Sequence, residues 1–154
     1  MKNLITFIAT ISLMTLLVAC PVAPIPNVNG VYSGYVQATN GNRVTAALAL
    51  RNDGQVAVKA GFAILSSGNV VAIPLSGSMN GNNFTVSYSD SSGSMSINGA
   101  VNSGTITGSF ALNTNSGNTS GTIYFTYYEA LSAQNLRMFD GLKGSLEDLS
   151  RALF

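Results

Sequence analysis

The sequence predicts an all-β fold, in which eight antiparallel strands form an up-and-down meander that closes into a small barrel or a curled sheet, with a C-terminal α-helix. Three observations lead to this prediction. Clusters of turn-forming residues recur at intervals of 11 to 14 residues between residues 40 and 120. The segments between these clusters alternate apolar and polar residues, which is typical of strands with one buried face. After residue 129, the apolar residues recur at helical spacing.

Turn clusters divide the body of the chain, residues 31–128, into strand-sized segments. Gly and Asn adopt the positive φ angles of tight hairpin turns more easily than other residues do, so their clusters mark the turns. Seven clusters imply eight strands that are joined mostly by hairpins. The glycines that mark the clusters are Gly41, Gly54, Gly68, Gly81, Gly93, Gly104 and Gly117.

Each predicted strand has one apolar face. The third strand alternates Val56, Val58, Ala60, Phe62 and Ile64 with smaller or polar residues, and the last strand does so with Ile123, Phe125 and Tyr127. A flat sheet would leave this face in water and two edges unpaired, whereas a barrel removes both problems. Pro74 lies within the fourth predicted strand and lacks an N–H group, so we expect an edge, a bulge or a local break there.

Residues 1–19 are predicted to be a signal peptide. Lys2 precedes an apolar stretch, residues 4–18, that is too short for a comfortable membrane span but fits the core of a signal peptide. The stretch ends in Leu17-Val18-Ala19-Cys20, which resembles the lipobox of bacterial lipoproteins. The resemblance implies a diacylglyceryl group on the Cys20 thiol, cleavage before Cys20 and acylation of the new N-terminus, for example by palmitate. The alternatives are a plain signal peptide with a chance cysteine and a buried N-terminal helix.

Residues 20–30 are predicted to be the lipidated cysteine and a tether. Pro21, Pro24 and Pro26 favour an extended, polyproline-like chain, although an irregular first strand is the alternative. The lipobox resemblance then implies a protein that is anchored to a membrane of the bacterial cell envelope and does not span it. That membrane is the outer membrane or the plasma membrane, and the domain faces the periplasm or the exterior. The membrane, bound through Cys20, is the first expected partner.

Composition excludes several functional classes. Once Lys2 leaves with the signal peptide, six Lys and Arg stand against six Asp and Glu, so the chain has no basic surface for nucleic acid. The chain has no His and a single Cys, so zinc and nucleophilic catalysis both lack their usual residues. Asp53 and Asp90 lie in predicted turns, where Asp usually bonds its own backbone. We therefore predict no enzyme activity, no metal and no cofactor.

The predicted barrel resembles the calycin-type small barrels, such as lipocalins and avidins, in strand number and in stretches such as residues 104–110. The Trp that those families carry near the first strand is absent here, so the resemblance implies a fold and no particular ligand. An eight-stranded interior is wide enough to be filled by side chains or to hold one small ligand. We expect inward-facing glycines to leave room for a ligand, and they are Gly34, Gly77, Gly99 and Gly108. The candidate ligand-binding residues are Tyr32, Phe84, Tyr88, Phe110, Phe125 and Tyr127.

Three functional classes are compatible with these features. The first is a lipid-anchored, non-catalytic module that binds a small apolar ligand inside the barrel. The second is a structural or interaction lipoprotein, such as an inhibitor or an assembly accessory, in which the phenylalanines fill an ordinary core. The third is a small outer-membrane barrel whose apolar face lies in lipid.

Residues 129–154 form the predicted C-terminal helical segment. Its apolar residues follow a spacing of three and four at Phe139, Leu142, Leu146, Leu149 and Leu153. Ser145 and Asp148 resemble a capping box, so a second helix can begin there. We expect docking on the small outer residues of strands two to four, which are Ala47, Ala49, Ala57, Gly61, Ala63, Val70 and Ala72. The alternatives are a seat on Tyr35, Tyr124 and Tyr128, a coiled-coil seam, a lid over the barrel mouth, and a helix that binds an envelope protein.

Overall fold

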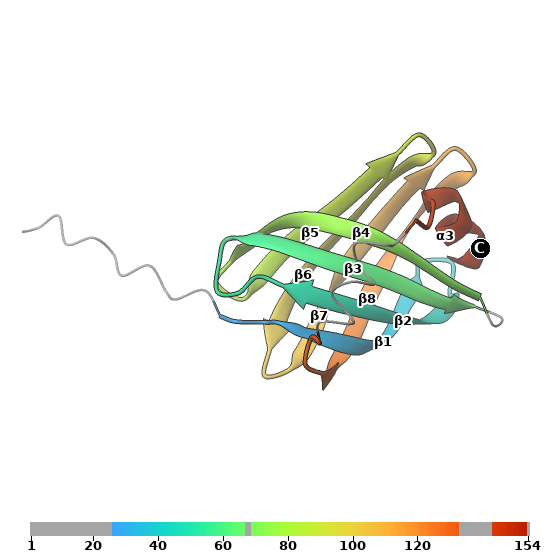
Figure 1. Cartoon of the computed structure of the whole chain (residues 1–154). Coiled ribbons are helices and arrows are strands. Elements are labelled where there is room, and N and C mark those ends of the chain that lie inside the picture. Colours follow the sequence, from blue (N-terminus) through green and yellow to red (C-terminus); the bar gives the residue numbers. More distant parts are fainter. Residues whose placement is uncertain (1–25, 67–68, 133–142, 154) are drawn as a thin grey trace, which may run out of the picture.

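A computed structural model of the chain describes residues 26–66, 69–132 and 143–153 (Figure 1). Within these ranges the chain forms eight strands and one helix, and it has no helix long and apolar enough to cross a bilayer. The elements are β1 (Gly30–Ala38), β2 (Arg43–Arg51), β3 (Ala57–Ser66), β4 (Asn69–Asn80), β5 (Asn83–Asp90), β6 (Gly93–Asn102), β7 (Thr105–Thr114), β8 (Gly117–Glu129) and α3 (Leu146–Leu153). The predicted signal peptide, Cys20 and the stretch with Leu136, Phe139 and Leu142 lie outside the described residues.

The strands form a closed antiparallel barrel in sequence order. Each strand pairs with the next along the chain, and β1 closes the barrel by pairing with β8. Tyr32, for example, lies opposite Leu48 of β2 on one side and opposite Tyr127 of β8 on the other. The predicted all-β fold with a C-terminal helix is confirmed, and of the two arrangements considered the sheet forms the barrel.

Alternation along each strand directs one apolar face into the barrel. The interior is filled by fully buried side chains such as Leu48, Phe62 and Phe125, while Ser, Thr and Asn cover the outer faces of β5 to β8. Val56 and Tyr127 depart from the predicted pattern, with exposed fractions of 58% and 48%. Val56 lies in the turn before β3, and Tyr127 lies at the rim of the barrel, so neither side chain reaches the core.

Helix α3 closes one end of the barrel. Leu146, Leu149 and Leu153 share its buried face and belong to the same core cluster as the barrel interior. Hydrogen bonds join the helix to turns at this end, since Asn42 Nδ2 donates to the carbonyl oxygen of Leu153 at 3.1 Å. Docking on the outer face of the strands is therefore wrong for this helix, which forms a lid over the barrel mouth. At the mouth the three leucines join the apolar core of the barrel and are buried there.

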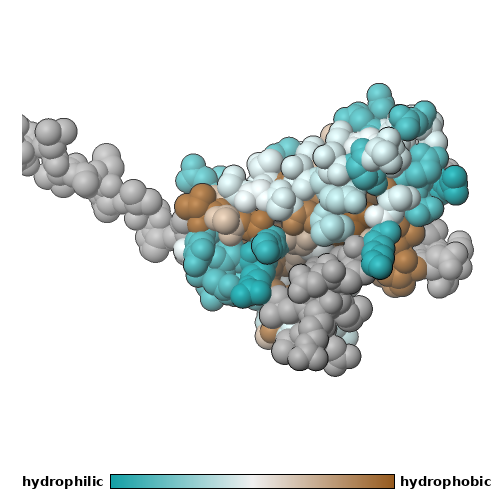
Figure 2. Space-filling view, turned by 45° about the horizontal axis from the view of Figure 1, so that its top comes forward, coloured by the Kyte–Doolittle hydropathy of each residue, from teal (hydrophilic) through white to brown (hydrophobic). Residues whose placement is uncertain are grey.

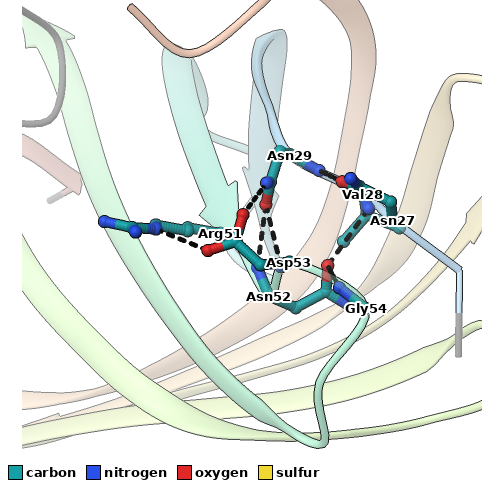
Figure 3. Close-up of polar contacts among 7 residues, drawn as sticks. All are labelled: Asn27, Val28, Asn29, Arg51, Asn52, Asp53 and Gly54. Carbon is teal, nitrogen blue, oxygen red and sulfur yellow. Dashed lines mark hydrogen bonds and ion pairs between the residues drawn. The ribbon is translucent and has the colours of Figure 1, made fainter. Parts of the chain in front are cut away.

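Residues 26–29 close the opposite end of the barrel, and Asn52 of the β2–β3 turn holds them there (Figure 3). The Asn52 side chain is buried, its Oδ1 accepts the Val28 N–H at 3.2 Å, and its Nδ2 donates to the Pro26 carbonyl at 2.8 Å. The Asn52 N–H donates to Asn29 Oδ1 at 2.9 Å, and the Tyr32 hydroxyl donates to the Val28 carbonyl at 3.0 Å. The described part of the predicted tether is thus packed against the barrel.

We expect the Leu149→Ala substitution to lower the free energy of unfolding by about 2–5 kcal/mol, because it removes a fully buried side chain from the lid. The Arg151→Ala substitution changes an exposed side chain on the same helix and should stay within about 0.5 kcal/mol of the wild type. Urea denaturation of the purified protein measures both. Equal stabilities of the two variants would show that α3 does not close the barrel.

Candidate functional site

The barrel wall opens between β4 and β5. Backbone pairing between these strands runs from Asn80 opposite Asn83 only as far as Ser76 opposite Ser87. Beyond that point β4 continues along β3 as far as Asn69, and β5 continues along β6 as far as Asp90. The two strands therefore diverge toward the end that α3 covers, and Figure 1 shows the β5–β6 hairpin turning away from β3 and β4.

Pro74 explains why the pairing stops. In an antiparallel ladder, every second residue directs its N–H and C=O groups toward the same neighbouring strand. The two-residue turn makes Asn80 and Asn83 the closing pair, so Ser78, Ser76, Pro74 and Ala72 direct their groups toward β5. Pro74 has no N–H to donate, and it is the next residue beyond Ser76 whose backbone groups face β5. The sequence prediction of an edge or a break at Pro74 is confirmed.

A groove lies along this opening. Its volume is about 610 Å³, which falls within the range of about 300–1,000 Å³ that is typical of small-ligand pockets. The described residues that line it are Ser76, Ser87, Tyr88, Ser89, Ser94, Met95 and Ser96. None of them is charged. Tyr88 and Met95 also pack against the core, so this groove joins the apolar interior to a surface of serine hydroxyl groups.

The start of α3 bridges β4 and β5 beyond the end of their pairing. The Gly144 N–H donates to the Ala72 carbonyl of β4 at 3.0 Å, and the Leu146 N–H donates to Asp90 Oδ2 of β5 at 3.1 Å. Residues 144–146 therefore join the two strands where their own pairing has ended. The Asp148 N–H donates to Ser145 Oγ at 3.1 Å, which confirms the predicted cap and fixes the first turn of the helix.

Asp90 carries the charge at this junction. Partial burial raises the pKa of its carboxyl group, but hydrogen bonds from Ser92 and from the backbone N–H groups of Leu146 and Gly93 outweigh that effect and leave the pKa below its ordinary value. The ionised carboxylate also lies at the positive end of the α3 dipole. Asp90 therefore does more than complete its own turn, because it also holds the lid.

The predicted ligand-binding residues divide into three groups. Phe84, Phe110 and Phe125 are buried in the core cluster, and Tyr88 alone of the six lines the groove. Tyr32 and Tyr127 lie together at the opposite end, with ring centroids 5.7 Å apart in an edge-to-face arrangement. Burial, with a smaller effect of Tyr127, raises the pKa of Tyr32, so its hydroxyl remains a donor to Val28. The structure therefore does not bring the six residues into one site.

Inward-facing glycines do not leave the space that the sequence analysis expected. A Cβ atom at Gly34 would lie 2.0 Å from the Tyr124 carbonyl oxygen, and one at Gly77 would lie 1.8 Å from the Thr85 carbonyl oxygen. The backbone of the neighbouring strand fills the position in both cases. At Gly99 the Phe84 ring does so, since a Cβ atom there would lie 2.6 Å from it. These glycines permit close packing of strands and rings and create no cavity.

The outer face of the barrel carries a second group of aromatic residues. Tyr35 of β1 stacks on Tyr124 of β8 with ring centroids 5.6 Å apart, and the Arg43 guanidinium carbon lies 3.4 Å from the centre of the Tyr35 ring. These tyrosines are the alternative seat predicted for the C-terminal helix. Helix α3 lies instead at the barrel mouth, where its apolar face is buried in the core.

Sequence reasoning missed the serines of the groove and the role of Asn52. The serines lie on outer strand faces whose sequence is typical of a solvated surface. Only their position near Pro74 distinguishes them from the other outer-face serines. Asn52 belongs to a turn-forming stretch with Asp53 and Gly54, so its side chain is expected to be exposed. In the structure the side chain is buried. Within the described ranges, no group of three His, Cys, Asp or Glu side chains could hold a metal ion.

Comparison with protein-family models, with curated proteins and with solved structures found no significant match to this chain.

We expect the Asp90→Asn substitution to lower stability by about 1 kcal/mol at neutral pH, since it removes the charge that caps α3. Because the pKa of Asp90 is lowered on folding, its contribution is present above the ordinary value of 3.8 and is lost as the pH falls through the folded-state value. The difference between the wild type and the variant should therefore disappear in acid. Hydrogen exchange of the α3 amides measures the loosening directly.

The Asp53→Asn variant is the matched control for this measurement. It removes a carboxylate from a turn at the opposite end, where Asp53 bonds Arg51 and Asn29. Its α3 amides should exchange as slowly as those of the wild type. Equally slow exchange in the Asp90→Asn variant would contradict the assigned role of Asp90.

Proposed function

We propose that the chain is a lipid-anchored protein of the bacterial cell envelope and that its barrel is a non-catalytic binding module for a small apolar ligand. The anchor is Cys20, at the outer membrane or the plasma membrane, and the stretch Leu17-Val18-Ala19-Cys20 supports this part of the proposal. The observation that carries the binding function is the groove between β4 and β5, where the partly buried Tyr88 connects the core to the surface.

The lining of the groove supports a ligand with an apolar body and few polar groups. Tyr88 is partly buried and offers the face or edge of an aromatic ring, while Met95 beside it is fully buried in the core. The surrounding serines offer hydroxyl groups that donate and accept hydrogen bonds. Because the described lining has no charge, a neutral ligand would lose least on leaving water. The ligand site then differs from the barrel interior that the sequence analysis favoured.

A structural or interaction lipoprotein with a filled core is the second candidate. The observation in its favour is that Phe84, Phe110 and Phe125 pack with the α3 leucines in one buried cluster. In that case the groove stays empty and the outer faces of the strands meet a protein partner of the envelope. The solvated face of α3, with Glu147, Asp148 and Arg151, then offers polar contacts to that partner. A small outer-membrane barrel has less support, because the apolar faces point inward.

We expect wild-type protein from bacterial cells to lack residues 1–19, to carry a diacylglyceryl group and to incorporate labelled palmitate. The Cys20→Ser variant should incorporate none, because the oxygen of serine does not replace the modified thiol. The Ser12→Ala variant changes the apolar stretch outside the four-residue motif and should be processed like the wild type. Intact-mass spectrometry and palmitate labelling measure these outcomes, and a wild-type chain with a free Cys20 thiol would contradict the anchor.

We expect native mass spectrometry of the protein purified from envelope extract to show a bound small molecule that leaves on denaturation. The Ser87→Tyr substitution adds a ring within the groove and should abolish this bound mass. The Ser109→Tyr substitution adds the same ring on the exposed face of β7, away from the groove, and should leave binding intact. A wild-type protein without a bound molecule would favour the second candidate, in which the core is filled and the surface binds a protein.

A further inference from the structure

We propose that the barrel rests on the membrane with one defined end, the anchor end, which comprises residues 26–29, the β2–β3 turn and the last residues of β8. This inference rests on the proposed lipid anchor and adds an orientation to it. The partner is the headgroup layer of the membrane that holds the acyl chains of Cys20. The length of the tether, the side chains exposed at this end and the attachment of residues 26–29 all support it.

The tether is short. Six residue steps separate Cys20 from Pro26, and an extended chain spans at most about 3.3–3.6 Å per residue, so the anchor end lies within roughly 22 Å of the acylated cysteine. The hydrogen bonds of Asn52 fix the chain at Pro26 and Val28, so the tether leaves the barrel from one defined place. The membrane is therefore always near this end of the molecule.

The rim of the anchor end exposes apolar and aromatic side chains. Val56 is 58% exposed, Tyr127 48% and Tyr128 70%, although all three are large residues. Val56 lies in the β2–β3 turn, whereas the two tyrosines lie at the end of β8, so the exposed groups lie on either side of the start of β1. Tyrosine suits the membrane interface, because its ring enters the headgroup layer while its hydroxyl stays hydrated. Figure 2 shows hydrophobic surface at this end of the barrel.

Charge does not oppose this contact. Arg51 and Asp53 neutralise one another through an ion pair of 2.9 Å, and Lys59 and Glu129 are the other described charges near this end. The two basic groups and the two acidic groups cancel. Contact with the headgroup layer therefore requires no excess of anionic lipid.

A second exposed apolar pair lies near the opposite end. Leu65 of β3 faces Val70 of β4 across the ladder, and Val70 is 63% exposed. Eight residues of β3 separate Leu65 from Ala57 at the anchor end, which is about 27 Å along the strand. Because barrel strands tilt by about 35–45° to the barrel axis, this length corresponds to roughly 19–22 Å of barrel height. An inverted barrel would therefore need the tether to be stretched close to its limit of about 22 Å, whereas the upright barrel needs no stretching. The tether therefore selects the end with Val56 and the tyrosines.

Depth-dependent fluorescence quenching tests the orientation on the full, processed chain. Lipidation consumes the Cys20 thiol, the only cysteine of the sequence, so a cysteine introduced by Val56→Cys is the only free thiol for an environment-sensitive dye. The labelled protein is inserted into phosphatidylcholine vesicles that carry nitroxide groups on a fraction of the lipid headgroups. Val70→Cys is the matched control, since it changes a similarly exposed valine near the opposite end. Tyr128→Cys repeats the measurement at the end of β8, in case the Val56→Cys variant does not fold.

We expect quenching and a blue-shifted emission at positions 56 and 128, and neither at position 70. If the chain is lipidated but positions 56 and 128 are quenched no more than position 70, the orientation is overturned while the anchor stands. Intact-mass spectrometry of the same samples separates the two failures. A chain whose Cys20 thiol is unmodified overturns the anchor, and the orientation with it.

Discussion

The end of the β4–β5 ladder at Ser76 and Ser87 is the constraint on which the rest of the structure depends. Beyond it, each strand presents an edge of backbone N–H and C=O groups that need partners. Gly144 supplies one to Ala72, and Leu146 donates to the Asp90 carboxylate across the same opening. These two bonds place the start of α3 at the opening, and its leucines then cover the end of the core. The groove lies along the part of the opening between this junction and the end of the β4–β5 pairing.

Much of the fold could be predicted from the sequence, because the two signals that determine it are local. Glycine and asparagine clusters mark the turns, and a period of two determines which face is buried, so strand number, antiparallel order and closure all follow. Pro74 likewise indicates a break, because a missing N–H is a property of the residue itself. The place of α3 could not be predicted. The spacing of Leu146, Leu149 and Leu153 shows which face is buried but not which surface covers it, and the partners Asn42, Asp90 and Thr114 are distant in sequence.

The candidate site was less predictable, because alternation does not distinguish a filled interior from a hollow one. Phe84 and Phe110 face inward in either case, and only the packing shows that they meet other core side chains. Glycines are equally ambiguous, since a missing side chain leaves space only if nothing else enters it. At Gly34 and Gly77 the neighbouring backbone does so. Asn52 is the opposite case. Its place in a turn predicts an exposed side chain, but the side chain is buried and holds residues 26–29. The likeness to lipoproteins and to calycin barrels stays a prediction from residues and strand number.

The two ends of the barrel are closed in different ways, and this difference separates the proposed functions in space. Asn52 holds residues 26–29 at one end through buried hydrogen bonds, and the proposed tether leaves from there. Helix α3 closes the other end through apolar burial and the charge of Asp90. The groove lies on the side wall next to that second end, since Ser89 and Ser94 flank the β5–β6 turn. A barrel that stands on its anchor end therefore holds the groove on the half that faces away from the lipid. Membrane contact and ligand entry would then use different surfaces, so occupation of one leaves the other free.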